Sequence, residues 1–299
     1  DLIIPAPYGW FFLTSDGIVF SADLVKFENR SLGLSTRTFI AMSDDGIVPR
    51  REPVEIKALA VDATKQGRIA ACTASEVFLS ENRGVNWTSL GSPSTSPGLK
   101  TLIFAPKDAS GSMALWVSHA IRGLFSLQKI EEEPKWVTQS AGLPRVFGSN
   151  VEEVSSFALF PNLSGQGGGT GELPTLVAGL TFLGRYFRFD SASSSFVEIF
   201  SPGSGKDFAV AEALGYAVGN FGYSLGQGVV QALYLDPATR KLQIAPDMAL
   251  TSILKEAIRS AGALGVAGAQ GSPAAPGADA AGVNSTPCVA FPRDFVRKG

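Results

Sequence analysis

The sequence contains very few of the residues that form metal sites, disulfide scaffolds or two-histidine active sites. Its 299 residues include one histidine, His119, and two cysteines, Cys72 and Cys288. A cysteine-rich scaffold, a zinc finger and a metal-binding histidine pair are therefore excluded by counting. We predict no metal and no cofactor. Cys72 lies among small apolar residues and is expected to be a buried thiol, and the alternative is a disulfide with Cys288.

The sequence also lacks an excess of charge of one sign and any long apolar segment. Lys and Arg number 25 and Asp and Glu 27, so the net charge is −2 and no global basic field exists to hold a nucleic-acid backbone. No apolar run reaches about 18 residues, so no membrane span is predicted. Leu2-Ile3-Ile4 is too short for the apolar region of a signal peptide, so none is expected here. Apolar residues make up 45% of the chain, which is enough for a core.

A repeated unit of four short strands is present through most of the chain. In the clearest copy, an apolar strand at 56–62 precedes a small-residue strand at 68–73, a third strand at 76–80 and an aromatic strand at 85–88. Further copies occupy 99–137, 154–199 and 208–244, and a first copy begins at Gly9. Such units, separated by Gly, Pro, Ser and Asn, are typical of propeller blades. We predict an all-β fold, a β-propeller of about five blades, with six or seven as the alternative.

The end of the chain predicts how the ring closes. The first copy lacks an opening strand, and Val289–Asp294 is similar to Ile103–Asp108 of the third copy. We therefore expect 288–293 to pair beside Trp10–Thr14 and remove an exposed edge. The predicted division is a propeller over 1–247, a helix over 248–267, a flexible Ala/Gly/Pro linker over 268–287 and a closing strand within 288–299. That last segment could lead into a further domain, so we expect the chain to be the N-terminal part of a longer protein.

The segment Ser80 to Trp87 carries a resemblance to a known repeat. It follows the pattern Ser-x-Asp/Asn-x-Gly-x-x-Trp and resembles the Asp-box, or BNR repeat, of sialidases, sortilin-like receptors and photosystem assembly factors. Asn82 replaces the commoner Asp, and only this unit has the full pattern. The resemblance implies a propeller in which Ser80, Asn82, Gly84 and Trp87 are structural and lie on the rim opposite the ligand. Elsewhere only the aromatic position recurs, at Phe27, Trp136 and Phe196, and Leu242 replaces it in the last unit.

The loops between the second and third strands converge at one mouth of a propeller, which makes them the candidate binding surface. Their mixture of charged, polar and aromatic side chains suits a peptide or a glycan. For His119 alone, a packed or hydrogen-bonded turn residue is the more frequent outcome. The residues singled out are Asp16, Glu76, His119, Arg122, Phe182, Arg185 and Tyr223.

The sequence favours a noncatalytic interaction module over an enzyme. We expect a monomer that binds a protein or glycan partner, and we predict no catalytic residue. The Asp-box resemblance implies a place outside the cytoplasm, in the periplasm, the bacterial envelope or the medium. The alternative is a glycoside hydrolase, in this ring or a following domain, because paired carboxylates can come from different blades. An assembly factor would need an arginine-rich patch, for which Arg37, Arg50 and Arg51 are candidates, close to the turn expected at Asp44-Asp45-Gly46.

Overall fold

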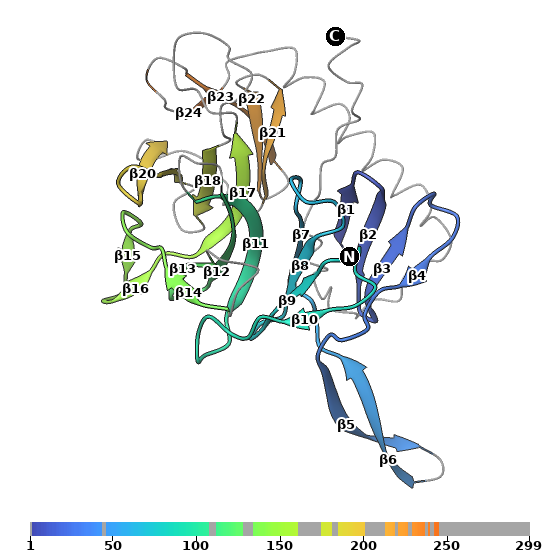
Figure 1. The fold of residues 1–299 in the computed structure, drawn as a ribbon. Helices are drawn as coiled ribbons and strands as arrows, with labels where there is room; N and C mark the ends of the chain where they lie inside the picture. Colours follow the sequence, from blue (N-terminus) through green and yellow to red (C-terminus); the bar gives the residue numbers. More distant parts are fainter. Residues whose placement is uncertain are drawn as a thin grey trace, which may run out of the picture.

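The computed structural model describes residues 2–43, 46–107, 112–127, 134–160, 175–180, 185–200, 213–218, 221–226, 229–236, 239 and 242–244. Within these residues the chain is all-β and forms five four-stranded antiparallel sheets and two two-stranded ribbons (Figure 1). The fold is a β-propeller, as predicted, while the number of blades stays a prediction. The helix, linker and closing strand expected after residue 247 lie outside the described residues.

Each of the five sheets is built from four strands that are consecutive in the chain. Sheet 1 contains β1 (Leu2–Ala6), β2 (Gly9–Thr14), β3 (Gly17–Ser21) and β4 (Glu28–Asn29). Sheet 2 contains β7 (Ala58–Val61), β8 (Ile69–Cys72), β9 (Val77–Ser80) and β10 (Thr88–Ser89). Sheet 3 contains β11 (Leu99–Pro106), β12 (Met113–His119), β13 (Gly123–Leu127) and β14 (Trp136–Thr138). Sheet 4 contains β17 (Val154–Phe160), β18 (Thr175–Leu180), β19 (Tyr186–Asp190) and β20 (Ser195–Phe200). Sheet 5 contains β21 (Ala213–Val218), β22 (Phe221–Gly226), β23 (Val229–Leu235) and β24 (Leu242–Ile244).

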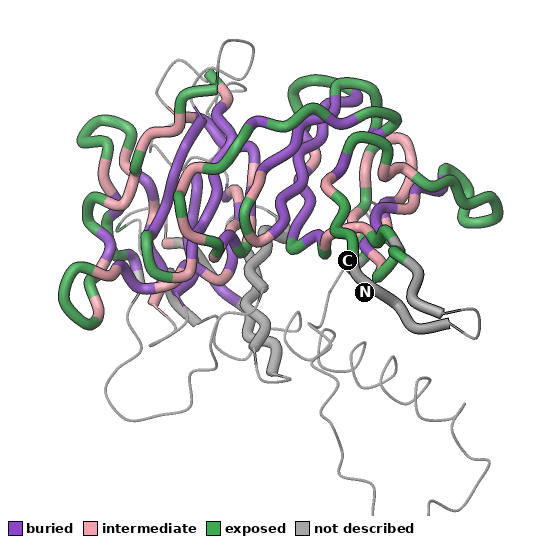
Figure 2. The backbone as a smooth tube through the Cα atoms, turned by 90° about the horizontal axis from the view of Figure 1, so that it is seen from below, coloured by how far each residue is buried: buried purple, intermediate pink, exposed green. Residues whose placement is uncertain are grey.

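The first strands of consecutive sheets lie side by side, β1 against β7, β7 against β11, β11 against β17 and β17 against β21. The core therefore lies between adjacent sheets, where Figure 2 shows the buried backbone. Sheet 2 illustrates the alternation: Ile69 and Ala71 join the apolar cluster shared with sheet 1, and Ala70 and Cys72 join the cluster shared with sheet 3. Since both faces of β8 are covered, the whole strand is buried, and three of its four residues are Ala or Cys.

Cys72 is a free thiol with no exposed surface. Burial raises its pKa to about 12, which keeps the sulfur protonated and unreactive. The expectation of a buried thiol is confirmed, and Cys288 lies outside the described residues.

Two strand assignments made from the sequence are wrong. The first unit does have an opening strand, because β1 pairs with β2 from Leu2↔Leu13 to Ala6↔Gly9. With β3 on its other side, β2 has no free edge among the described residues, and the predicted closing strand 288–293 lies outside them. Pro5 makes this strand hard to recognise in the sequence. β1 is an edge strand, and an edge strand tolerates proline at positions where no N–H is needed for pairing.

In the last unit, the sequence places Tyr223 in a loop between the second and third strands. Tyr223 instead lies inside β22, opposite Gly215 of β21 and Ala232 of β23. The glycines near Tyr223 favour a loop in the sequence. Pairing with β21 on one side and β23 on the other makes this segment a strand.

A hairpin that the repeat does not predict is inserted between sheets 1 and 2. β5 (Thr36–Ser43) pairs with β6 (Gly46–Pro53) along its whole length, from Thr36↔Pro53 to Ser43↔Gly46. Figure 1 shows this ribbon extending away from the sheets. A shorter ribbon, β15 (Arg145–Val146) with β16 (Asn150–Val151), connects sheet 3 to sheet 4.

Candidate functional site

The loops between the second and third strands of neighbouring sheets are joined by backbone hydrogen bonds into one rim. In the β8–β9 loop, the carbonyl of Ala74 accepts the N–H of Gly98, which precedes β11, at 2.7 Å. The carbonyl of Gly98 accepts the N–H of Ala120 in the β12–β13 loop at 2.8 Å. Next to it, the carbonyl of Ile121 accepts the N–H of Val151, at the entry to sheet 4, at 3.1 Å. The rim therefore gathers predicted site residues from sheets 2, 3 and 4.

Glu76 lies on this rim, but its carboxylate is used to hold the sheets. Oε2 accepts the Ser35 hydroxyl at 2.7 Å, and Oε1 accepts the Ser89 hydroxyl at 2.5 Å. Ser35 immediately precedes β5, and Ser89 lies in the last strand of sheet 2. Glu76 thereby fastens the connection after sheet 1 to both the rim and the outer strand of sheet 2.

His119 is a buried turn residue, as the more frequent outcome suggested, with 1% of its surface exposed. Its Nδ1 accepts the N–H groups of Ile121 at 3.2 Å and Arg122 at 3.3 Å, and its Nε2 donates to the Ser96 carbonyl at 3.2 Å. A neutral ring satisfies all three bonds, and burial lowers the pKa of His119, which favours that form. A Cβ on Gly98 would lie 2.7 Å from the ring, so this glycine is needed for the close approach.

Arg185 is also on the rim and is held by an acidic residue that the sequence analysis missed. Its Nη2 donates to Oε2 of Glu152 at 2.6 Å, and only 1% of the Glu152 side chain is exposed. Nη1 lies 3.8 Å from Glu198, and the guanidinium stands 5.8 Å from the centre of the Phe187 ring. The pair joins the entry of sheet 4 to its β18–β19 loop. Glu152 lies two residues before the apolar strand β17, and an acid in such a connection is expected to be solvated.

The other predicted residues have different outcomes. Asp16 and Arg122 are exposed, and within the described part of the chain neither side chain has a hydrogen-bond or ion-pair partner. Phe182 lies outside the described residues. Tyr223 belongs to a strand and not to a rim loop, for the reason given above. The structure therefore leaves Arg122 as the free cation among the predicted residues of sheets 2 to 4 that it describes.

The β15–β16 ribbon, which is bonded to the β12–β13 loop, adds an aromatic residue to this rim. Val151 of β16 is bonded to Ile121, and Val151 pairs with Arg145 across the ribbon. At the tip, Phe147 is 90% exposed and has a positive φ of 49°, an unfavourable conformation for a bulky residue. The Arg145 guanidinium donates to the Ser149 carbonyl at 2.8 Å across the turn. We call Ile121, Arg122, Arg145 and Phe147 the rim patch. The Gly148-Ser149-Asn150 turn was the sequence signal that could have revealed it.

The Asp-box-like segment forms a hydrogen-bonded turn at the other end of β9. The Ser80 hydroxyl donates to Asn82 Oδ1 at 2.9 Å and accepts the Gly84 N–H at 2.8 Å, where φ is +80°. Asn82 Oδ1 also accepts the Asn86 N–H at 2.9 Å. Trp87 is 5% exposed and belongs to the apolar cluster between sheets 1 and 2. The residues thus hold a turn and fill the space between two sheets.

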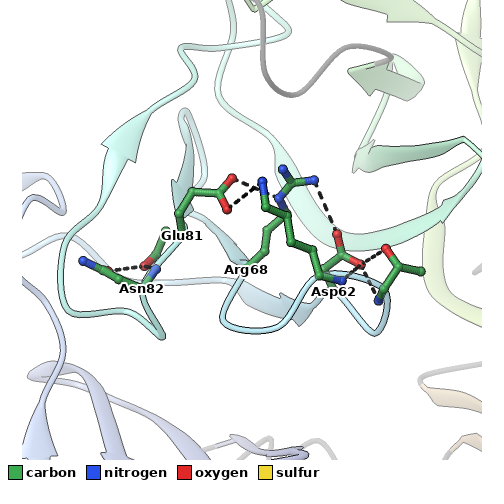
Figure 3. Close-up of polar contacts among 7 residues, drawn as sticks. Asp62, Arg68, Glu81 and Asn82 are labelled. Carbon is green, nitrogen blue, oxygen red and sulfur yellow. Dashed lines mark hydrogen bonds and ion pairs between the residues drawn. The ribbon is translucent and has the colours of Figure 1, made fainter.

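Beside this turn, an ion-pair cluster ties the β7–β8 loop to the β9–β10 loop (Figure 3). Arg68 Nε donates to Glu81 at 2.9 Å, and its Nη1 lies 3.6 Å from Asp62, whose side chain is fully buried. Lys65 Nζ lies 3.3 Å from Glu81. An open groove of about 460 Å³ adjoins the cluster, with Leu79, Leu90, Pro134, Asn86 and Thr88 in its lining. The charges of the cluster are paired, so the groove offers apolar side chains together with amides and hydroxyls.

Within the described ranges, no three His, Cys, Asp or Glu side chains are placed to hold a metal ion. The same part of the chain contains no helix that could cross a bilayer.

No protein-family model matches the sequence, and no characterised protein matches it in sequence. Solved structures of similar fold include the GH74 xyloglucanase from Xanthomonas campestris, which is 15% identical, covers 81% of this chain and has a TM-score of 0.51. An auxiliary nutrient binding protein from Bacteroides thetaiotaomicron is 10% identical over 63% of the chain, with a TM-score of 0.46. YCF48 from Cyanidioschyzon merolae is 11% identical over 78%, with a TM-score of 0.45. This chain spans 38%, 40% and 68% of their lengths, respectively. The likeness to the xyloglucanase supports the β-propeller fold alone.

Proposed function

We propose that this chain is a noncatalytic binding module whose rim patch recognises an acidic segment of a partner protein. The observation that carries the proposal is the gathering of two exposed arginines, Arg122 and Arg145, with Ile121 and Phe147 on adjacent loops. Arginine and aromatic residues dominate binding energy in protein interfaces. A place outside the cytoplasm is part of the same proposal and is supported by the Asp-box resemblance.

The shape of the patch favours a protein segment. Phe147 and Ile121 are 90% and 46% exposed, and burying such apolar surface stabilises a complex. The bond from Arg145 to the Ser149 carbonyl orders the ribbon before a partner arrives, which lowers the entropy cost of binding. Carboxylates on the partner would pair with both guanidinium groups in bidentate geometry.

The rim carboxylates support a noncatalytic role. A glycosidase needs two carboxyl groups free to act on the substrate, about 5–9 Å apart. Glu76 accepts two hydroxyl groups, and Glu152 is buried against Arg185. Neither is free to donate a proton to a leaving group or to attack one.

The test is binding to an array of peptides graded in acidic content, with a glycan array in parallel. We expect acidic peptides that carry an aliphatic or aromatic residue to bind, more weakly at high salt. The triple variant Arg122→Ala, Arg145→Ala, Phe147→Ala should lose at least about tenfold in affinity. The matched control Asn86→Ala with Thr88→Ala, in the groove beside the Asp-box-like turn, should bind normally.

Three outcomes would contradict the proposal. Unchanged affinity in the triple variant would move the site away from the rim patch. Binding on the glycan array alone would change the class of partner. Hydrolysis of a glycoside by the purified chain would replace the binding module with an enzyme.

A further inference from the structure

The β5–β6 ribbon has one strand edge that is closed to pairing and one that is open. β6 contains Pro49 and Pro53, four positions apart and opposite Ile40 and Thr36. Proline has no N–H, so in a paired strand it occupies positions whose nitrogen faces away from the partner strand. Both prolines therefore lie on the outer edge of β6, where they prevent a further strand from pairing.

β5 has no such block. Thr36–Ser43 contains no proline, and its threonine, phenylalanine and isoleucine residues favour strands. Because Thr38 lies midway between the pairs Thr36↔Pro53 and Ile40↔Pro49, its N–H also faces away from β6. Within the described residues, no strand other than β6 pairs with β5. The outer edge of β5 therefore offers unpaired N–H and C=O groups along eight residues.

An open edge of this kind is expected to pair with another strand. An isolated two-stranded hairpin is only marginally stable in water, and an eight-residue unblocked edge is a template for another strand. The ribbon extends away from the sheets, so an approaching chain would meet little obstruction from the propeller (Figure 1).

We infer that the partner is a second copy of this chain, with the two β5 strands paired antiparallel about a two-fold axis. The result is a four-stranded sheet in the order β6, β5, β5 of the second copy and β6 of the second copy. Isologous pairing of this type closes after two copies, because the proline-bearing β6 strands then form both outer edges.

The inference is independent of the rim patch and differs from the monomer expected from the sequence.

The experiment measures the mass of the full chain by light scattering and sedimentation over a dilution series. We expect a concentration-dependent dimer. Thr38→Pro should weaken the dimer at least tenfold, because it removes an outward N–H while leaving the bonds to β6. The matched variant Thr38→Val keeps the N–H and should dimerise like the wild type. Both variants should retain the wild-type melting temperature, since the ribbon lies outside the sheets.

A wild-type chain that stays monomeric at its highest attainable concentration would overturn the inference. A dimer that survives Thr38→Pro unchanged would overturn it equally, because the contact would then lie elsewhere.

Discussion

Trp87 in sheet 2 and Trp136 in sheet 3 make the same contact with the sheet that precedes each of them. The indole N–H of Trp87 donates to the Arg30 carbonyl at 2.7 Å, and that of Trp136 donates to the Leu90 carbonyl at 3.1 Å. A buried indole needs an acceptor for its N–H, and here the acceptor is the backbone of the neighbouring sheet. The aromatic position of the repeat therefore fastens adjacent sheets with one hydrogen bond and one packed ring.

Trp87→Ala should destabilise the fold by about 3–5 kcal/mol, because it leaves a cavity between sheets 1 and 2 and removes the bond to Arg30. Trp136 is only half-buried, so Trp136→Ala should cost less. Urea unfolding monitored by circular dichroism measures both. Equal losses in the two variants would mean that burial does not set the difference.

Gly142→Ala should destabilise the chain more than Gly148→Ala. Both glycines have positive φ, +84° and +77°, so both variants incur a strain of about 1–2 kcal/mol. A Cβ on Gly142 would clash with the Phe196 carbonyl, whereas nothing lies within 4 Å of one on Gly148. The comparison isolates the clash from the strain. Matching melting temperatures would show that the connection between sheets 3 and 4 yields to the extra methyl group.

Glu152→Gln should cost about 3 kcal/mol, because it leaves the Arg185 guanidinium without its charge partner at a largely buried site. Glu198→Gln provides the control. Glu198 lies 3.8 Å from Arg185 and 40% of its side chain is exposed, so its loss should be within about 0.5 kcal/mol. Denaturant midpoints of the two variants give the result. A larger loss of stability for Glu198→Gln than for Glu152→Gln would mean that Glu198 is the principal partner of Arg185.

Stability should decrease as the pH falls below about 6.5, because the folded chain resists protonation of His119. His119 is the single histidine of the chain, so no other histidine contributes in this range. Burial lowers the pKa of His119 from 6.5 in the folded state, so the unfolded chain binds the proton more strongly. Its full contribution is present above 6.5 and is lost progressively as the pH falls toward the lower, folded-state value. Asp and Glu side chains ordinarily titrate at about pH 4, below this range.

The measurement is the free energy of unfolding between about pH 7 and pH 5, in the wild type and in His119→Asn. Asparagine keeps an acceptor for the N–H groups of Ile121 and Arg122 but does not titrate. The variant should be less stable at neutral pH and nearly flat across this range. Parallel slopes in the two proteins would assign the pH dependence to another group.

Much of the fold is legible in the sequence where local pattern and tertiary environment agree. The unit 56–88 contains β7 to β10 close to the predicted positions. Its second strand, Ile69–Cys72, is recognisable because both faces of β8 are covered, so every residue is apolar and three of the four are Ala or Cys. Its aromatic position is recognisable because a large ring fills the gap to the preceding sheet. These requirements are local, so composition and spacing carry them.

The candidate site is harder to predict from the sequence. Whether each of its charged residues is free or structural depends on partners that are distant in the chain. Glu76 and Arg122 look equivalent in sequence, as charged residues in corresponding loops. Ser35, 41 positions away from Glu76, makes one a structural acceptor, while Arg122 stays exposed. Phe147 belongs to the site through a bond between Val151 and Ile121, 30 positions apart in the numbering.

Alternation and turn residues act over a few positions, so they are enough to predict an all-β repeat with aromatic residues between sheets. Three further features depend on the folded chain: β1 completes sheet 1, Tyr223 lies in a strand, and the β5–β6 ribbon stands apart with one edge blocked by Pro49 and Pro53. Pairing partners decide these features, since a strand is stabilised by its neighbours as much as by its own residues.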